Sequence, residues 1–387
     1  MKFFRTIHRI LCLTAALLVF ASACAAEEAF GIGEEGLDLT ESVSVRYPVL
    51  SGGTDEELLA KINSLIREKC RIETYIMRMT SLLSGGNLKV EWKGGLLGDV
   101  FSCAVSASGA VENSRPTQVW TAASVDLRDG HAITFSELFT DEEAAREIIE
   151  AYLEETVAPD LSAHLLNSDL TPLPDVFLLE QSGLTMLYPV EQLSTLSDRA
   201  GDIRIGWNIL KEVLDPDEDG IPARIGAQDA AALTVQGAEK LRAMAAEGAM
   251  TDVPARIGDS MQELTDRYHT LTDWDGIEEG RLFALEGGCF RGVYLVTDNL
   301  TKDWKSSVVQ AIRMDQGCLW GLCPGETLRS EWLGMLGEPD GTAEVGEKKA
   351  EANRLVPGTC DYYRCGDYLL QLYGDTDGTL VSIVLSE

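Results

Sequence analysis

Two pairs of cysteines near the C-terminal end have a spacing that suits a metal site. Four residues separate Cys318 from Cys323, and four separate Cys360 from Cys365. Together the pairs could supply four thiolates to a tetrahedral zinc ion, because structural zinc sites draw their ligands from such close pairs. The competing interpretation, which we prefer, is that these residues form disulfides or stay as buried thiols.

The N-terminal half contains a candidate disulfide. Beyond the first 25 residues the chain has an odd number of cysteines, which are Cys70, Cys103, Cys289, Cys318, Cys323, Cys360 and Cys365. Cys70 and Cys103 form the only pair available within the N-terminal half. An exported location would permit a bond between them.

No histidine lies in a catalytic sequence context. Beyond the N-terminal segment the histidines are His131, His164 and His269, and none belongs to an HExxH motif or a nucleophile elbow. We interpret them as solvated or packed side chains. Among the 63 acidic residues no pair stands out as general acid and base. We therefore expect a protein that is not an enzyme and has no cofactor.

One acidic stretch matches the first half of a calcium loop. Asp215, Asp217 and Asp219 alternate and are followed by Gly220, as in a loop whose oxygens surround the ion. The twelfth position, where a bidentate glutamate is required, is Gly226. We therefore predict an acidic linker here.

The first 25 residues have the order of an export signal. Lys2, Arg5 and Arg9 precede an apolar run over 10–20, and small residues follow over 21–26. A basic start, a short apolar run and small residues are typical of secretory signals. We therefore expect an extracytoplasmic protein.

The cleavage site allows two processing routes. Residues 21–24, Ala-Ser-Ala-Cys, resemble the lipobox of bacterial lipoproteins, and residues 23–25, Ala-Cys-Ala, fit ordinary signal peptidase. If a lipid is attached, Cys24 carries it and provides membrane attachment. The preferred alternatives are secretion and a lipid anchor on the outer face of the cytoplasmic membrane, and the third is an uncleaved signal that stays as a membrane anchor.

The acidic composition limits the classes of molecule that the protein can bind. The formal net charge is −31, and 45% of the residues are hydrophobic. A surface this acidic repels nucleic acid and anionic lipid and favours cations. We expect no nucleic-acid partner.

Residues 40–214 are predicted to form an α+β domain. Strand-like runs occur at 43–50, 88–92, 100–106 and 119–127, and apolar residues at helical spacing predict one helix over 55–83. The segments Tyr47–Leu50, Val125–Gly130, Ile133–Phe139 and Phe177–Leu184 resemble the extracytoplasmic domain shared by PdaC-type deacetylases and the RsiV anti-sigma factor. That resemblance implies an antiparallel sheet with packed helices, and its relatives include a lysozyme sensor.

After an acidic, alanine-rich connector at 215–252, residues 253–387 contain an internal repeat. Each copy, 253–314 and 315–387, starts with a capped helix and continues with three strand-like runs. The pattern predicts a tandem repeat of a helix plus a three-stranded antiparallel sheet. It resembles BamE-like and β-lactamase-inhibitory-protein-like domains, which implies a binding or assembly role without catalysis.

These features together favour a non-catalytic binding protein of the bacterial cell envelope. The expected partner is a basic, lysozyme-like envelope protein or a cell-wall component. The alternative is an accessory factor or enzyme that acts on peptidoglycan. Aromatic residues of the repeats are candidates either for the contact surface or for the core, and these are Trp274, Trp304, Trp320, Trp332, Tyr362, Tyr363 and Tyr373.

Overall fold

The computed structural model describes residues 29–53, 55–82, 86–109, 117–158, 165–195, 201–268, 270–278, 280–285, 292–298 and 300–387. The expected signal segment with Cys24 lies outside the described residues, as do Cys289, His164 and His269. Within the described ranges, no helix combines the length and the apolar character needed to cross a bilayer.

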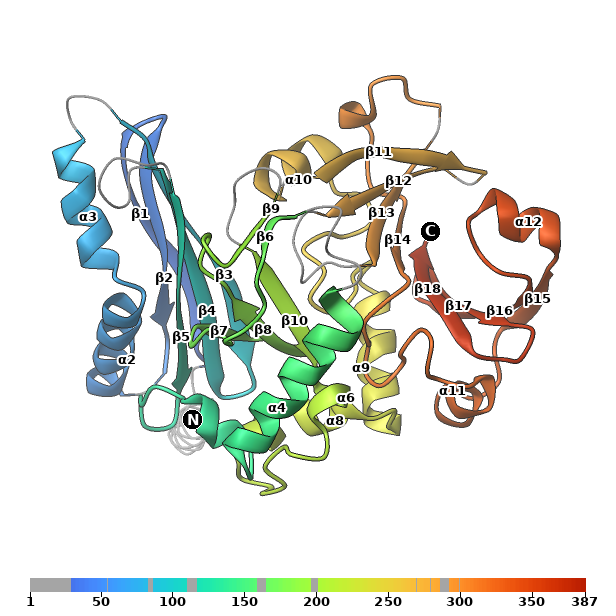
Figure 1. The fold of residues 1–387 in the computed structure, drawn as a ribbon, viewed down its shortest axis with the longest axis horizontal. Helices are drawn as coiled ribbons and strands as arrows, with labels where there is room; N and C mark the ends of the chain where they lie inside the picture. Colours follow the sequence, from blue (N-terminus) through green and yellow to red (C-terminus); the bar gives the residue numbers. More distant parts are fainter. Residues whose placement is uncertain are drawn as a thin grey trace, which may run out of the picture.

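The N-terminal part is built on a five-stranded sheet (Figure 1). In spatial order its strands are β1 (Gly31–Thr40), β2 (Val43–Ser51), β3 (Leu88–Leu97), β4 (Val100–Gly109) and β5 (Thr117–Asp126). Neighbours are antiparallel except β2 and β3, which are parallel because two helices connect them. These helices, α2 (Glu56–Lys69) and α3 (Ile72–Ser81), cover one face of the sheet (Figure 1).

The single helix expected over 55–83 is two helices, α2 and α3. Asp55 caps the first helix by accepting hydrogen bonds from the backbone N–H groups of Glu57 and Leu58. The break follows Cys70, where Arg71 adopts a left-handed conformation with φ of 55°. The bend brings residues of both helices, including Ile62 and Tyr75, into one buried cluster under the sheet.

A three-stranded sheet packs on the other face of β4 and β5. Its order is β10 (Asp202–Gly206), β8 (Gly183–Leu187) and β7 (Phe177–Leu179). The Ser102 hydroxyl of β4 accepts a hydrogen bond of 2.9 Å from the Leu179 N–H of β7. The remaining elements of this half are η1 (Phe135–Leu138), α4 (Glu142–Tyr152), the π-helical turn η2 (Leu153–Val157), β6 (Leu165–Ser168), β9 (Leu193–Thr195) and α6 (Trp207–Leu210).

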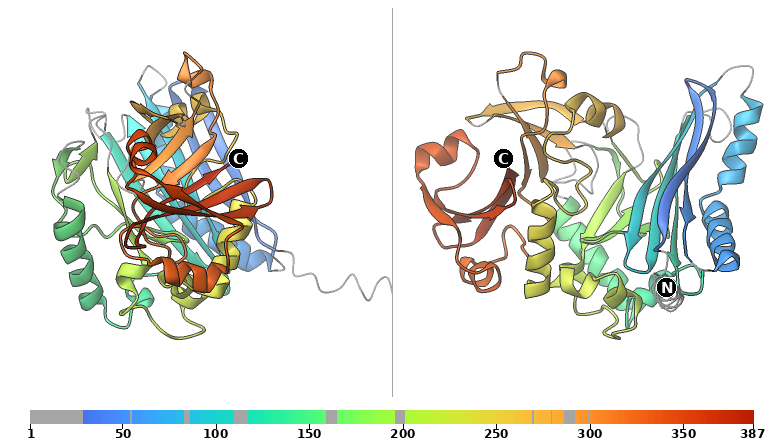
Figure 2. Two further views of the ribbon diagram at one scale, coloured as in Figure 1. Left: turned by 90° about the vertical axis from the view of Figure 1, so that its right-hand side faces the viewer. Right: turned by 180° about the vertical axis from the view of Figure 1, so that it is seen from behind.

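The segment 215–252, expected to be a connector, packs into the largest core of the molecule. It forms α7 (Ile221–Arg224), α8 (Ala227–Ala231) and α9 (Val235–Ala245). Ile221 and Leu241 are buried in a cluster that extends from Val100 in β4 to Leu385 near the C-terminus. Small alanine side chains let these helices approach their neighbours closely, and Figure 2 shows α9 lying between the two halves.

The C-terminal residues form two units that share one sheet. The first contains α10 (Met261–Tyr268), β11 (Thr270–Ile277), β12 (Gly280–Leu285), β13 (Val293–Thr297), η4 (Trp304–Ser306) and β14 (Ala311–Met314). The second contains α11 (Arg329–Leu336), β15 (Gly341–Val345), α12 (Glu347–Ala352), β16 (Gly358–Cys365), β17 (Tyr368–Asp375) and β18 (Leu380–Ser386). The strands lie in the order β11-β12-β13-β14-β18-β17-β16-β15, so the last strands of the two units pair with each other.

The α+β class is therefore confirmed, with a correction to the repeat unit. Each unit contributes four strands rather than three, and the two sets merge into one eight-stranded antiparallel sheet. The strands that the sequence pattern missed, β11 and β15, lie at the two edges of that sheet. Four of the repeat aromatics are core residues rather than a contact surface: Trp320, Trp332, Tyr363 and Tyr373 are all buried.

Candidate functional site

A cavity of about 270 Å³ lies where the N-terminal half meets the C-terminal units. Tyr152 and Thr156 line it from α4 and η2, and Arg204 and Asn208 line it from β10 and α6. Residues of the segment 316–326, which follows β14, form the opposite wall. Segments far apart in the sequence therefore meet around one concavity, as in many ligand sites.

The backbone around this cavity departs from regular structure at three places. The turn η2 is π-helical, a form that is rare and is often found at functional sites. Asp252 and Trp320 have positive φ angles of 56° and 50°, and each is next to residues that line the cavity. Such conformations persist only where the surrounding structure holds them.

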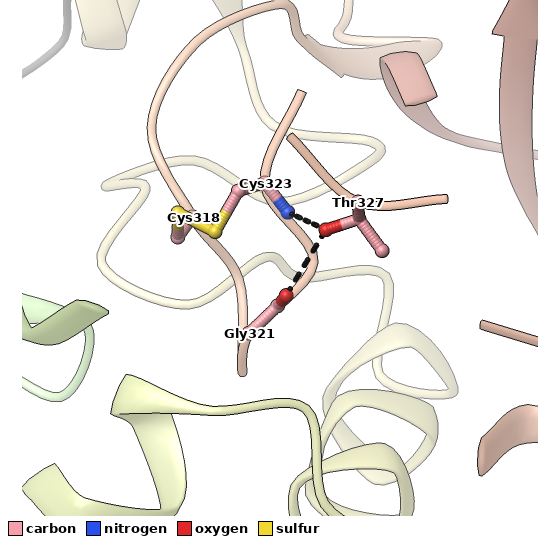
Figure 3. The surroundings of a disulfide bond; sticks show 4 residues. All are labelled: Cys318, Gly321, Cys323 and Thr327. Atoms are coloured by element: carbon pink, nitrogen blue, oxygen red, sulfur yellow. Dashed lines mark hydrogen bonds between the residues drawn. A yellow bond between two sulfur atoms is a disulfide. The ribbon is translucent and has the colours of Figure 1, made fainter. Parts of the chain in front are cut away.

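A disulfide between Cys318 and Cys323 forms part of the cavity wall (Figure 3). The Thr327 hydroxyl accepts a hydrogen bond of 2.8 Å from the Cys323 N–H and donates one of 3.2 Å to the Gly321 carbonyl. Between the cysteines, Trp320 is buried and its indole N–H donates to the Thr251 hydroxyl at 3.0 Å. The loop is thus fixed at both ends and in its middle.

Gly321 is required at the turn in this loop. Its φ is 78°, which a residue with a side chain rarely adopts. An added Cβ atom would also collide with the backbone of Ala232 and Leu233. The turn therefore packs directly against the chain between α8 and α9.

The zinc interpretation of Cys318, Cys323, Cys360 and Cys365 is wrong. Cys318 and Cys323 are bonded to each other, so neither offers a thiolate. Cys360 and Cys365 are both buried, but they are five residues apart on β16 and therefore point to opposite faces. Cys360 packs beside Tyr373, whereas Cys365 belongs to the main core.

The structure brings Cys70 and Cys103 together as thiols. Their Sγ atoms are 3.8 Å apart in the N-terminal core, whereas bonded sulfurs lie at about 2.05 Å. The hydrogen bond with Cys70, together with burial, raises the pKa of Cys103 well above its ordinary value. The Cys103 thiol is therefore held protonated in this arrangement.

Next to the cavity, a cluster of buried charges surrounds Arg204. The Arg204 guanidinium donates through Nε to Glu180 at 3.0 Å and through Nη2 to the Asp252 carbonyl at 3.3 Å. The Asp252 carboxylate accepts a 2.6 Å hydrogen bond from the Ser182 N–H. Burial acts to raise the pKa of Glu180, but the charges of Arg204 and Lys93 outweigh it and leave the pKa lowered.

The net shift of Asp252 is in the opposite direction. Desolvation raises its pKa above the ordinary value, although the charge of Arg204 acts against that change. Glu180 is ion-paired with the Arg204 guanidinium, so the positive charge of Arg204 is already neutralised from within the protein.

His131 lies at a surface turn and is bound by carboxylates on both sides. Its Nδ1 is 2.6 Å from Asp129 and its Nε2 is 2.8 Å from Glu137. The hydrogen bond with Asp129 raises the pKa of His131, with a further contribution from Glu137 and partial opposition from burial. Ligand atoms of Asp126, Asp129 and His131 lie within 4.8 Å of one another. Arg224, however, already occupies both oxygens of Asp126, each at 2.6 Å.

The acidic stretch that begins at Asp215 is folded back on its own backbone. The Asp215 carboxylate accepts a hydrogen bond from the Asp217 N–H, and the Asp217 carboxylate accepts one from the Asp219 N–H. These oxygens cap a turn before α7, and the residues that follow, such as Ile221 and Ile225, are buried rather than part of a solvated linker.

Sequence reasoning missed the residues that define the cavity. Arg204, Thr251 and Glu326 belong to three segments and share no motif. The available signal was an arginine between two isoleucines in the short run 202–206, since a charge in an apolar strand requires a buried partner.

Comparisons with known proteins give distant structural similarity only. No family model matches the chain, and no curated protein matches it. A DUF3298 family member from Bacteroides fragilis is 13% identical, with a TM-score of 0.39 over 52% of this chain and 98% of its own. A DUF3298 family protein from Pseudomonas aeruginosa is also 13% identical, with a TM-score of 0.35 over 49% of this chain and 95% of its own.

A DUF4309 family protein from Bacillus subtilis is 16% identical, with a TM-score of 0.30 over 40% of this chain and 97% of its own. Similarities at this level assign no function to the chain. The functional argument therefore rests on the geometry described above.

Proposed function

We propose that this chain is a non-catalytic extracytoplasmic binding protein of the bacterial cell envelope that recognises a basic, lysozyme-like protein. The observation that carries the proposal is the acidic face of α4 and η2, which we define as Glu143, Glu147, Glu150 and Glu154. They follow one another at intervals of four, three and four residues, which places them on one side of a helix. A buried row that includes Ala145, Ile149 and Leu153 anchors the opposite side in the core.

This acidic face is not neutralised from within the protein. Arg146, the basic residue of α4, pairs with Glu142 at 3.0 Å. No described cationic side chain forms an ion pair with a member of the acidic face. Four carboxylates within three helical turns create a local negative field, added to a chain whose net charge is −31. A cationic protein surface is the matching partner.

The arrangement of His131 supports a binding role rather than a catalytic one. Both of its ring nitrogens are engaged by Asp129 and Glu137, so neither is directed at a neighbouring nucleophile. Asp126, the third potential catalytic group at this turn, is held by Arg224.

The test is a titration of lysozyme into the purified chain at about 20 mM and 300 mM salt. We expect binding at low salt that weakens as salt rises, because charges separated by more than ~8 Å are screened at physiological ionic strength. Replacing all four glutamates of the acidic face by glutamine should weaken low-salt binding by about tenfold or more, from ~0.2–1 kcal/mol per exposed pair.

The matched control removes the same charge elsewhere. Glu338, Glu344, Glu347 and Glu351 are exposed residues of the second C-terminal unit, and their replacement by glutamine should change binding much less. Equal loss in the two variants would show that only net charge matters. No binding of wild type at low salt would refute the basic-protein proposal and favour a cell-wall component as the ligand.

A further inference from the structure

The cavity between the two halves carries one charge that the protein does not neutralise. Two charged residues line it, Arg204 and Glu326. Arg204 is paired with Glu180 at 3.0 Å, and the Asp252 carboxylate lies beside it. Glu326 is exposed and forms no ion pair with any cationic side chain in the described part of the chain. The unmatched charge on the cavity wall is therefore negative.

Glu326 is held in place by the disulfide loop. Its N–H donates to the Cys323 carbonyl at 3.0 Å, and the N–H of the next residue, Thr327, donates to the same carbonyl at 3.0 Å. Figure 3 shows Thr327 tied back to Cys323 and Gly321 beside the disulfide. The turn that carries the carboxylate is thus fixed before any ligand arrives, which reduces the entropic cost of binding.

Apolar and uncharged polar side chains make up the rest of the wall. Val157, Ile203 and Val293 contribute apolar surface from both halves of the molecule, and Thr156 and Asn208 contribute polar groups. Aliphatic surface beside one unmatched carboxylate suits a short alkyl chain that ends in a positive charge.

We propose that this cavity accepts the side chain of a lysine from the partner protein, with Glu326 as the counter-ion of its ammonium group. The proposal rests on the proposed function, since it assumes a basic protein partner, and it names the group that enters the protein. The methylenes of the lysine lie against the aliphatic wall while the ammonium stays near the exposed carboxylate, as amphipathic side chains prefer. The acidic face on α4 and η2 attracts the partner, and the cavity selects one of its lysines.

The first test uses a small probe and the full chain. N-acetyl-lysine-methylamide is titrated by calorimetry against its norleucine analogue, which has a similar chain but no charge. We expect saturable binding of the lysine probe and about fivefold weaker binding of norleucine, the range of one partly exposed ion pair. Equal affinity for both probes, or no binding of either at millimolar concentrations, would overturn the proposal.

Two variants identify the site. Glu326→Gln should weaken the lysine probe to the level of norleucine and leave norleucine unchanged. Gln316→Trp places a bulky side chain on an exposed position of the cavity wall and should abolish binding of both probes. Glu347→Gln, an exposed glutamate outside the cavity, is the control and should change neither. Unaltered lysine binding by both cavity variants would refute the assignment of the site.

The same variants separate this inference from the proposed function. If lysozyme binds and the acidic-face variant weakens it, but Glu326→Gln and Gln316→Trp do not, the cavity proposal fails while the binding function stands. If lysozyme does not bind but the lysine probe does, the cavity proposal stands for another lysine-bearing partner.

Discussion

Arg224 is a residue whose removal we expect to loosen the attachment of the segment 215–252 to the N-terminal sheet. Its guanidinium contacts both oxygens of Asp126 at 2.6 Å and the Asp99 carboxylate at 2.8 Å. The Arg224 and Asp126 side chains are 9% and 6% exposed. The bond therefore ties α7, in the segment once expected to be a loose connector, to the end of β5.

Replacing Arg224 by methionine keeps most of the side-chain stem and removes the charge. Asp126 then loses its cationic partner while Asp99 keeps Arg128, and losing one member of a buried ion pair costs about 3–5 kcal/mol. Because the Asp99 side chain is one-third exposed, at 34%, we expect the lower end, ~3 kcal/mol. At 2–4 °C per kcal/mol for a domain of roughly 150–250 residues, the melting temperature should fall by about 6–12 °C.

The assay is urea unfolding followed by tryptophan fluorescence, together with limited proteolysis. Wild type should resist cleavage within 215–252, whereas Arg224→Met should become sensitive there. Arg128→Met is the control, because Arg128 also pairs with Asp99 but is 52% exposed and should lose under about 1 kcal/mol. Adding Asp126→Asn to Arg224→Met should recover part of the loss. If Arg224→Met is no less stable than Arg128→Met, our account of this contact is wrong.

Three further predictions concern stability. Asp361 is fully buried and accepts hydrogen bonds from Arg329, Trp332 and Thr342, so Asp361→Asn should cost about 2 kcal/mol in urea unfolding. Burial opposes ionisation, but these hydrogen bonds outweigh it and lower the pKa of Asp361. The stabilisation by Asp361 is therefore present above its unfolded pKa and is lost as pH falls through the lower folded pKa. A difference in free energy of unfolding between wild type and Asp361→Asn that stays constant down to pH 2 would contradict this. The pKa of His131 is raised, chiefly by Asp129, so its contribution to stability is complete below about pH 6.5 and disappears as pH rises through the folded pKa. The melting temperature of His131→Gln should therefore differ from that of wild type at pH 5.5 and converge with it by pH 9. Cys318→Ser with Cys323→Ser should destabilise by about 2 kcal/mol, and dithiothreitol should reproduce that loss in wild type but not in the variant.

Local patterns predicted the pieces of this fold better than their assembly. Alternating residues marked β12–β14 and β16–β18, because each strand buries one face. The edge strand β15 was missed because its face is mostly exposed and its sequence, Gly-Thr-Ala-Glu-Val, lacks apolar alternation. The helix break at Arg71 was missed because the apolar spacing continues through it while only the backbone changes.

The candidate site was less accessible to prediction, for a physical reason. The cysteine spacing was visible, but whether two sulfurs bond or bind a metal depends on which other thiols the fold brings near. Alanine-rich residues over 215–252 looked like a connector, since small side chains carry a weak hydrophobic signal. Several of these alanines, including Ala230, Ala238 and Ala245, are buried, because their small size allows close packing.

The pairing of β14 with β18 also sets an order for folding. As the chain is made from its N-terminal end, β14 appears with an unpaired edge, and its partner β18 follows more than sixty residues later. Until then an aggregation-prone strand edge stays open in the middle of the future sheet. A partly synthesised chain therefore lacks the strand that closes the middle of its largest sheet, and a delay in making the final residues leaves the centre of that sheet open rather than one of its edges.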